Sequence, residues 1–289
     1  MTAILVIIAV LLAGYGLLNQ TISWNDTQLL RYQSDKLRNA KGVKVLLVGD
    51  SSLGNAIDAS AWSEALQKPV LSSALTGLYG LGGSLNMIRR AVRTQPIETV
   101  IVFQHTGFMA RAPRPEGGLL TAERWADLDL VPFPTVSSWL VNFSVSLNVL
   151  ATLITGRQDR AVLFRQFDYV PQAPALPDIR DELPSSPIAP ADIDLGHSAF
   201  LSRIGALCEE KKIRCLYAHG PFAAASCVKS GAFIAEVNRQ VRAAGLIPVS
   251  KTPICMSWQE TGDTPNHVRP SFKPWYSERY LELIGPYLN

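Results

Sequence analysis

Short apolar segments rich in β-branched residues alternate with helical segments along this chain, and this alternation restricts the fold more than any other feature. The clearest segment, residues 43–48, reads V-K-V-L-L-V and ends in a Gly-Asp-Ser-Ser turn at residues 49–52. Runs of this length, closed by turn residues, are typical of buried strands. Strands that alternate with helices form parallel sheets with helices on both faces. The sequence therefore predicts an α/β fold, a three-layer sandwich with a mainly parallel sheet.

The predicted strands and helices fall into two groups, separated by a long stretch with many prolines. This stretch, at about 111–195, contains an apolar helical segment at 137–155 and an extended, proline-rich and acidic segment at 170–191. We interpret it as a large insertion in one domain that covers residues 43–289. The predicted strands are 43–48, 69–71, 99–103, 213–217 and 246–249, and the predicted helices are 57–66, 84–93, 198–210, 232–244 and 275–287.

The N-terminus predicts a membrane anchor. Residues 3–18 read AILVIIAVLLAGYGLL, an uncharged apolar run of about one bilayer thickness. No A-x-A-like cleavage site follows this run. We therefore expect an uncleaved signal anchor, or transmembrane helix, at 1–20 and a helical stalk at 21–42. A cleaved signal peptide and a buried helix are the alternatives.

The charges that flank this anchor leave its orientation open. Basic residues follow it, and the positive-inside rule alone would keep the C-terminal part in the cytoplasm. Long domains, however, cross a membrane largely regardless of such charges, and the acidic Asp26 and Asp35 dilute the signal. The basic residues are Arg31, Lys36, Arg38, Lys41 and Lys44.

The composition fits a globular domain and excludes some classes of partner. The chain is 47% hydrophobic and 18% charged, with a formal net charge of +3. It has no Lys/Arg run with interleaved aromatic residues, so we expect no nucleic-acid partner. No cysteine lies in a C-x-x-C motif or at zinc-ligand spacing with histidine, so we expect no metal site. We also expect no cofactor.

The four cysteines permit one or two disulfides. An even number of cysteines allows such pairing in an oxidising compartment, and buried free thiols are the alternative. Cys227 with Cys255 is the first pairing to test, because both residues precede the loop that carries the candidate base. The other two cysteines are Cys208 and Cys215.

Ser51 lies where the first predicted strand ends. In open parallel sheets, ligands bind at the carboxyl ends of the strands. A serine there can direct its hydroxyl into a crevice while the following backbone amides face an oxyanion. A Gly-Asp-Ser tripeptide alone is weak evidence, because turns use the same residues. Ser51 is thus a candidate nucleophile, and turn chemistry is the alternative.

Asp263 and His267 provide a candidate base. They lie in a proline-containing loop, D-T-P-N-H, that precedes the last predicted helix. A serine hydroxyl needs a base to take its proton. An imidazole does so near neutral pH, and a carboxylate holds the ring in the productive tautomer. Alternatively, Asp263 caps the turn and His267 is a surface residue.

Together these segments resemble the SGNH (GDSL-like) hydrolase superfamily. Its hallmarks are a nucleophilic serine in a Gly-Asp-Ser after the first strand and an Asp/His pair just before the last helix. Ser51, Asp263 and His267 match these two motifs. The resemblance implies a Ser-His-Asp triad on an SGNH-type sandwich, and it covers residues 43–108 and 198–289.

The oxyanion hole departs from the family pattern. Residues 69–77 look like the second motif, which implies that the amides of Ser51 and Gly77 face the oxyanion. The third motif usually brings Gly-x-Asn-Asp, whose asparagine donates a further hydrogen bond. Here the strand is followed by Gln104, His105 and Thr106. Either one of these three substitutes as donor or the hole has two amides only, and losing one donor costs about a hundred- to a thousand-fold in rate. His105 is equally a candidate for a packed loop residue.

The order of anchor and domain points to one branch of the superfamily. It resembles cell-envelope O-acyltransferase proteins, such as those of alginate O-acetylation and teichoic-acid D-alanylation. The resemblance implies serine-dependent acyl transfer, expected as O-acetyl transfer, on an extracytoplasmic envelope polysaccharide. It also implies a membrane-anchored domain in the periplasm or at the cell surface, working beside a multi-spanning acyltransferase. The alternatives are an esterase or lipase that hydrolyses acyl esters, and a non-catalytic SGNH-like scaffold or glycan-binding subunit.

Two further histidines lie near this region. His219 ends a predicted strand beside the expected crevice and is a candidate substrate contact. His197 precedes a predicted helix, which it could simply cap.

Overall fold

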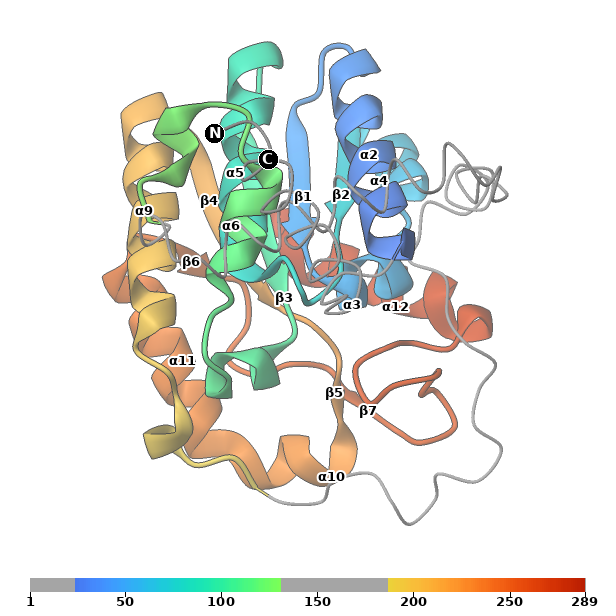
Figure 1. Cartoon of the computed structure of the whole chain (residues 1–289). Coiled ribbons are helices and arrows are strands. Elements are labelled where there is room, and N and C mark those ends of the chain that lie inside the picture. The colour runs from blue at the N-terminus through green and yellow to red at the C-terminus, as the bar shows by residue number, and fades with distance from the viewer. Residues whose placement is uncertain (1–23, 131–186, 289) are drawn as a thin grey trace, which may run out of the picture.

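A single parallel sheet forms the centre of the computed structural model, which describes residues 24–130 and 187–288 (Figure 1). Its five strands have the order β2-β1-β3-β4-β6, and they pair in parallel. The α/β fold with a parallel sheet, predicted from the sequence, is confirmed. The strands are β1 (Val45–Gly49), β2 (Val70–Ala74), β3 (Thr99–Gln104), β4 (Arg214–His219) and β6 (Ile247–Pro248).

Helices cover both faces of the sheet and give three layers. Side chains alternate between the faces along each strand. In β3, Val100 and Val102 join one core cluster, whereas Ile101 and Phe103 join the other. All four are fully buried, which explains why β3 is an unbroken apolar run rather than an alternating one. The first cluster includes α5 (Gly80–Thr94), α9 (Gly196–Lys211) and α11 (Gly231–Ala243), and the second includes α3 (Ser51–Ala56), α4 (Ala59–Leu66) and α12 (Lys273–Ile284).

Helix α2 (Trp24–Asn39) lies in the predicted stalk, but it packs against the domain. Leu29 and Leu37 are buried, because they lie on the side of the helix that faces the rest of the chain. The side-chain amide of Gln33 donates a hydrogen bond to the carbonyl of Ala74 at the end of β2 (2.9 Å). The helix is therefore fixed to the sheet edge rather than extending as a free stalk.

The beginning of the predicted insertion also packs on the domain. Helix α6 (Pro115–Thr121) lies against α5, and Asn86 of α5 donates a hydrogen bond to the carbonyl of Gly118 (2.7 Å). Arginines of α5 pair with the carboxylates that follow α6, and such paired, partly buried charges fix a segment better than exposed ones do. The pairs are Arg89 with Asp129, Arg90 with Glu123, and Arg93 with both Glu123 and Asp127.

The predicted membrane anchor at 3–18 falls outside the part that the structure describes, as does the apolar helical segment at 137–155. Within residues 24–130 and 187–288, no helix combines the length and apolar character needed to cross a bilayer.

The four cysteines form two disulfides, Cys208–Cys215 and Cys227–Cys255. The second is the pairing that the sequence placed first. The alternative of buried free thiols is wrong for this structure.

Candidate active site

Ser51 is the first residue of α3 and follows directly after the end of β1 and Asp50. Asp50 caps the helix, since its carboxylate accepts a hydrogen bond from the backbone N–H of Ser52 (2.8 Å). Ser51 opens the helix, so its own N–H has no acceptor within it. The turn thus puts a serine hydroxyl and a backbone N–H together at the carboxyl edge of the sheet, where Ser51 is 7% exposed.

The structure brings Ser51, His267 and Asp263 into one chain of hydrogen bonds. The Nε2 of His267 lies 2.7 Å from the Oγ of Ser51, and the Nδ1 lies 2.6 Å from a carboxylate oxygen of Asp263. A carboxylate only accepts hydrogen bonds, so the proton between them belongs to Nδ1. In the neutral ring, Nε2 is then free to accept the proton of Ser51. This is the geometry that a base-activated serine requires.

The loop that carries Asp263 and His267 is closed on itself. Thr261 and Val268 form an antiparallel bridge, and the N–H of Gly262 donates a hydrogen bond to the carbonyl of His267 (2.7 Å). Val268 is fully buried beneath the loop, in the core that includes α12. The backbone on both sides of His267 is therefore fixed, which fixes the direction of its ring.

Asp50 connects the serine turn to the end of β3. One carboxylate oxygen accepts hydrogen bonds from the N–H and the hydroxyl of Ser52, and the other accepts one from the N–H of His105 (2.8 Å). Burial raises the pKa of the Asp50 carboxyl, and the hydrogen bonds from Ser52 and His105 oppose this rise. All of its contacts are structural, so Asp50 positions Ser51 rather than reacting. The sequence placed Asp50 in the Gly-Asp-Ser motif but did not predict that its carboxylate would position Ser51.

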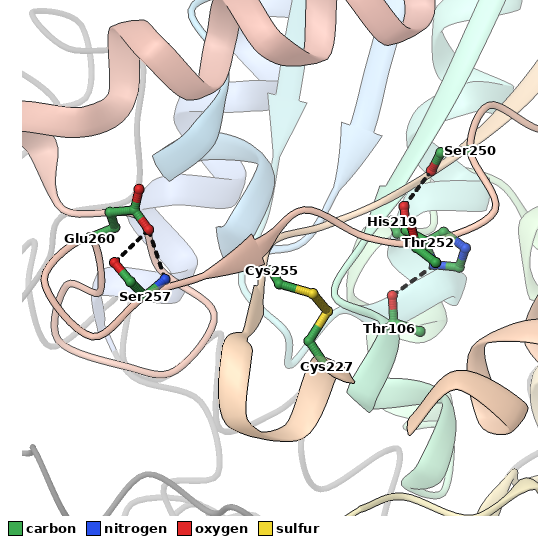
Figure 2. Close-up of a disulfide and its surroundings, with 8 residues drawn as sticks. All are labelled: Thr106, His219, Cys227, Ser250, Thr252, Cys255, Ser257 and Glu260. Atoms are coloured by element: carbon green, nitrogen blue, oxygen red, sulfur yellow. Dashed lines mark hydrogen bonds between the residues drawn. A yellow bond between two sulfur atoms is a disulfide. The ribbon is translucent and has the colours of Figure 1, made fainter. Parts of the chain in front are cut away.

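His219 is a packed residue, not an open binding group. Its Nδ1 lies 2.8 Å from the hydroxyl of Thr106 (Figure 2). Its Nε2 lies 3.0 Å from the amide oxygen of Asn238. It is 1% exposed, and burial lowers the pKa of His219 to about 4. Because both ring nitrogens are engaged, this arrangement does not support the substrate contact expected of His219. It connects the end of β4 to α11 instead.

Of the three candidates for the third oxyanion donor, one lines a cavity. The hydroxyl of Thr106 is occupied by His219, and Thr106 is fully buried. His105 packs its ring against Phe108 and Phe222, and burial lowers its pKa to about 3. Gln104, in contrast, ends β3 and lines a cavity.

This cavity, of about 230 Å³, is also lined by Gly77. Gly77 follows β2, and a β-carbon there would lie 2.7 Å from the ring of Phe108. The close approach of that ring explains why the position is a glycine. A larger hollow, of about 510 Å³, lies between residues 250–254 and α12, and neither cavity is lined by Ser51 or His267.

A disulfide fixes the segment that leads to the base loop. Strand β7 (Cys255–Met256) pairs with the short strand β5 (Phe222–Ala223), and Cys255 is bonded to Cys227 at the end of α10 (Ala224–Cys227), as Figure 2 shows. Next along the chain, Glu260 accepts hydrogen bonds from the N–H and the hydroxyl of Ser257 (both 2.7 Å). The start of the loop is thus held covalently as well as by hydrogen bonds.

Sequence reasoning missed Gly220 and the pocket residues Arg111 and Arg114 as parts of this region, and it gave His197 no place in a cavity. Gly220 lies against Ser52, and His197 lines the cavity rather than acting only at a helix start. His219 marked the end of a predicted strand, but Ser52, which Gly220 contacts, is distant in the sequence. No local pattern signals such a contact.

Across the described ranges, no three His, Cys, Asp or Glu side chains are grouped so that they could hold a metal ion. The site is built from a serine, a histidine and an aspartate at the carboxyl edge of a parallel sheet. In comparisons with known proteins, the chain matches no family model, no curated protein and no solved structure.

Proposed function

We propose that this chain is a serine-dependent acyltransferase of the SGNH type, which moves an acyl group, expected to be O-acetyl, onto a hydroxyl of a cell-envelope polysaccharide. The proposal rests on one observation: Ser51, His267 and Asp263 form a continuous chain of hydrogen bonds of 2.7 and 2.6 Å. The same order of donors and acceptors activates serine nucleophiles on unrelated folds.

The proposed reaction begins with attack of the Ser51 Oγ on the acyl carbonyl. The hydroxyl proton passes to Nε2 of His267, and Asp263 stabilises the imidazolium that forms. The leaving alcohol of the donor ester then takes this proton, which leaves an acyl group on Ser51. In the second half, a sugar hydroxyl gives its proton to His267 and attacks the acyl carbon, and Ser51 regains its proton as the acylated sugar departs.

The developing oxyanion needs hydrogen-bond donors. The amides of Ser51 and Gly77 are the proposed donors, and the side chain of Gln104 is the proposed third. Its place at the cavity beside Gly77 supports this choice over His105 and Thr106. Donors fixed by the fold cost no reorganisation when charge develops, which is why they contribute strongly to rate.

The two disulfides support an extracytoplasmic location, because such bonds persist in oxidising compartments. We propose that residues 3–18 anchor the domain to the membrane and that it faces the periplasm or the cell surface. A multi-spanning acyltransferase is the proposed source of acyl groups. This partner follows from the resemblance in layout and not from a described contact.

A serine-reactive fluorophosphonate probe tests whether the chain is an enzyme. The full-length protein in detergent is expected to be labelled, and Ser51→Ala and His267→Ala are expected to abolish the labelling. Ser60→Ala is the matched control, because Ser60 is exposed and lies in α4, outside the site. Absence of labelling in folded wild-type protein would favour the rival function, a non-catalytic scaffold, which the missing family asparagine favours.

A second experiment separates transferase from esterase. The full-length protein is incubated with an acetyl-ester donor, with and without oligosaccharides, and the products are analysed by mass spectrometry. The transferase produces acetylated sugar in the presence of an acceptor. If every mixture yields free acetate alone, the chain is an esterase.

A further inference from the structure

The cavity of about 230 Å³ is lined by residues at the ends of the two strands that flank β1, the strand that precedes Ser51. Gly77 follows β2 and Gln104 ends β3, and both residues line the cavity. The strands β2 and β3 are the two neighbours of β1 in the sheet, where Gly49 pairs with Ala74 on one side and Phe103 on the other. A ligand in the cavity would therefore lie beside the proposed oxyanion site.

The mouth of this cavity is positively charged. Arg111 and Arg114 line it, and both are exposed. Within the described ranges, neither arginine has an ion pair with a carboxylate, and no Asp or Glu is among the residues that line the cavity. The guanidinium of Arg111 is held over the ring of Phe108 at 5.0 Å. Two arginines that line one cavity, one of them held over an aromatic ring, are suited to binding an anion.

Two residues that line the cavity, Gln104 and His197, carry buried hydrogen-bond acceptors. The Oε1 of Gln104 and the Nδ1 of His197 are buried and have no hydrogen-bond partner among the described residues. The Nε2 of His197 lies 2.7 Å from the carbonyl of Arg111, so it carries a proton, and Nδ1 of the neutral ring is an acceptor. Gln104 and His197 are 2% and 6% exposed. Unpaired buried polar atoms are costly, and hydroxyl groups of a ligand would satisfy them.

We propose that this cavity binds a hydroxylated organic anion, either a sugar acid or a sugar phosphate. The hydroxyls of the ligand would donate to Gln104 and His197, while its carboxylate or phosphate would accept hydrogen bonds from Arg111 and Arg114. The volume is below the usual range of drug-sized pockets, so it suits one sugar ring rather than a long chain. The identification of this ligand as the acyl acceptor rests on the proposed function. The prediction that the cavity binds such an anion does not depend on that function.

Binding of three monosaccharides to the full-length protein in detergent tests the proposal. D-glucuronate, D-glucose 6-phosphate and D-glucose differ chiefly in charge and are titrated separately by calorimetry or by ligand-observed NMR. Because hydrogen bonds to charged groups contribute more than neutral ones, at least one anion is expected to bind about tenfold more tightly than glucose, or better. The anion that binds more tightly identifies a carboxylate or a phosphate as the source of the charge.

Charge-removing variants connect the preference to the two arginines. Arg111→Gln, Arg114→Gln and the double variant are expected to reduce the preference, and the double variant to remove it. Arg242→Gln removes an equal charge from an exposed position at the C-terminal end of α11, and it is expected to bind as the wild type does. Equal binding of all three sugars to the wild type, or an unchanged preference in the double variant, would overturn the proposal.

The fluorophosphonate experiment keeps this inference separate from the proposed function. If the wild-type protein is labelled at Ser51 but does not prefer an anion, the proposed enzyme stands and the anion-binding cavity is refuted. If the wild-type protein prefers an anion but is not labelled, the anion-binding cavity stands and the proposed enzyme is refuted.

Discussion

Gly220 lies so close to Ser52 that a β-carbon added to Gly220 would be 2.5 Å from the Oγ of Ser52. The same β-carbon would lie 3.2 Å from the backbone N of His105. Ser52 and His105 are the two residues that donate hydrogen bonds to Asp50. The end of β4 therefore packs directly against the turn that positions Ser51, and glycine is what permits this approach.

Gly220→Ala is expected to disturb the turn that positions Ser51, because Gly220 packs directly against this turn. The new methyl group must displace Ser52 or the backbone at His105, and overpacking of this kind costs about 1–3 kcal/mol of stability. The rate of fluorophosphonate labelling at Ser51 is expected to fall as well, because the turn shifts. Gly231→Ala is the control, since a β-carbon there would meet nothing within 4 Å. Equal stability and equal labelling rates for the two variants would contradict this prediction.

Asp263→Asn tests the role of the carboxylate in orienting His267. An amide can donate a hydrogen bond to Nδ1, which would place the ring proton on Nε2 and leave no base facing Ser51. The labelling rate is expected to fall about 10³- to 10⁴-fold, the range that follows from a wrong histidine tautomer in serine enzymes. The midpoint of urea unfolding checks that the variant is folded. Asp35→Asn, on the exposed side of α2, is the control.

Much of the fold could be predicted because its signals are local. The runs at 43–48 and 99–103 became β1 and β3, and their apolar character reflects burial on both faces of a parallel sheet. The strands β5 and β7 have two residues each, too few to show a periodic pattern. The stalk at 21–42 looked polar, yet the buried Leu37 and the hydrogen bond from Gln33 to Ala74 hold α2 against the domain.

The residues of the candidate site likewise divide into those with a local sequence signal and those without one. Ser51, Asp263 and His267 stood in short motifs whose chemistry is visible in the residue types, so their meeting could be expected. The role of Asp50 depends on the N–H of His105, which is 55 residues away. The burial of His219 depends on Asn238, 19 residues further along the chain. Contacts between positions without a shared motif cannot be inferred from one sequence.

Gln104→Ala measures the proposed third oxyanion donor. If the side chain stabilises the developing charge, the variant is expected to lose about 10²- to 10³-fold in the rate of acyl-enzyme formation. The ground-state affinity for the donor ester should change little, because the interaction strengthens only in the transition state. Pre-steady-state measurement of acylation separates these two effects. A rate within about threefold of the wild type would assign the oxyanion hole to the backbone amides alone.

The double variant Cys227→Ala/Cys255→Ala is expected to lower the free energy of unfolding by about 3–4 kcal/mol, because the bond closes a loop with a sequence separation of 28. Removal of Cys208–Cys215, with a separation of 7, is expected to cost less. The first variant should also slow labelling of Ser51, since β7 leads into the base loop, whereas the second should not. Urea unfolding and labelling rates check both statements. Equal losses of stability, or labelling affected only by the second variant, would count against them.

Acid is expected to destabilise the folded domain through its buried histidines. Burial lowers the pKa of His105 to about 3 and that of His219 to about 4 in the folded protein. The corresponding value in the unfolded chain is about 6.5. Between these values the unfolded chain binds more protons than the folded protein, so stability falls as the pH falls from about 6.5 toward 4. Asp50 acts in the opposite direction, because burial raises its pKa and the folded protein holds that proton more tightly.

The variant His219→Gln isolates one of these contributions. It is expected to be less stable than the wild type at pH 7.5, because the contacts with Thr106 and Asn238 are lost or altered. Its stability should, however, fall by about 2 kcal/mol less than that of the wild type between pH 7.5 and pH 4.5, since one buried histidine no longer titrates. Urea unfolding at several pH values gives both curves. Parallel curves would mean that His219 keeps an ordinary pKa and that its ring is more accessible to water than its packing between β4 and α11 implies.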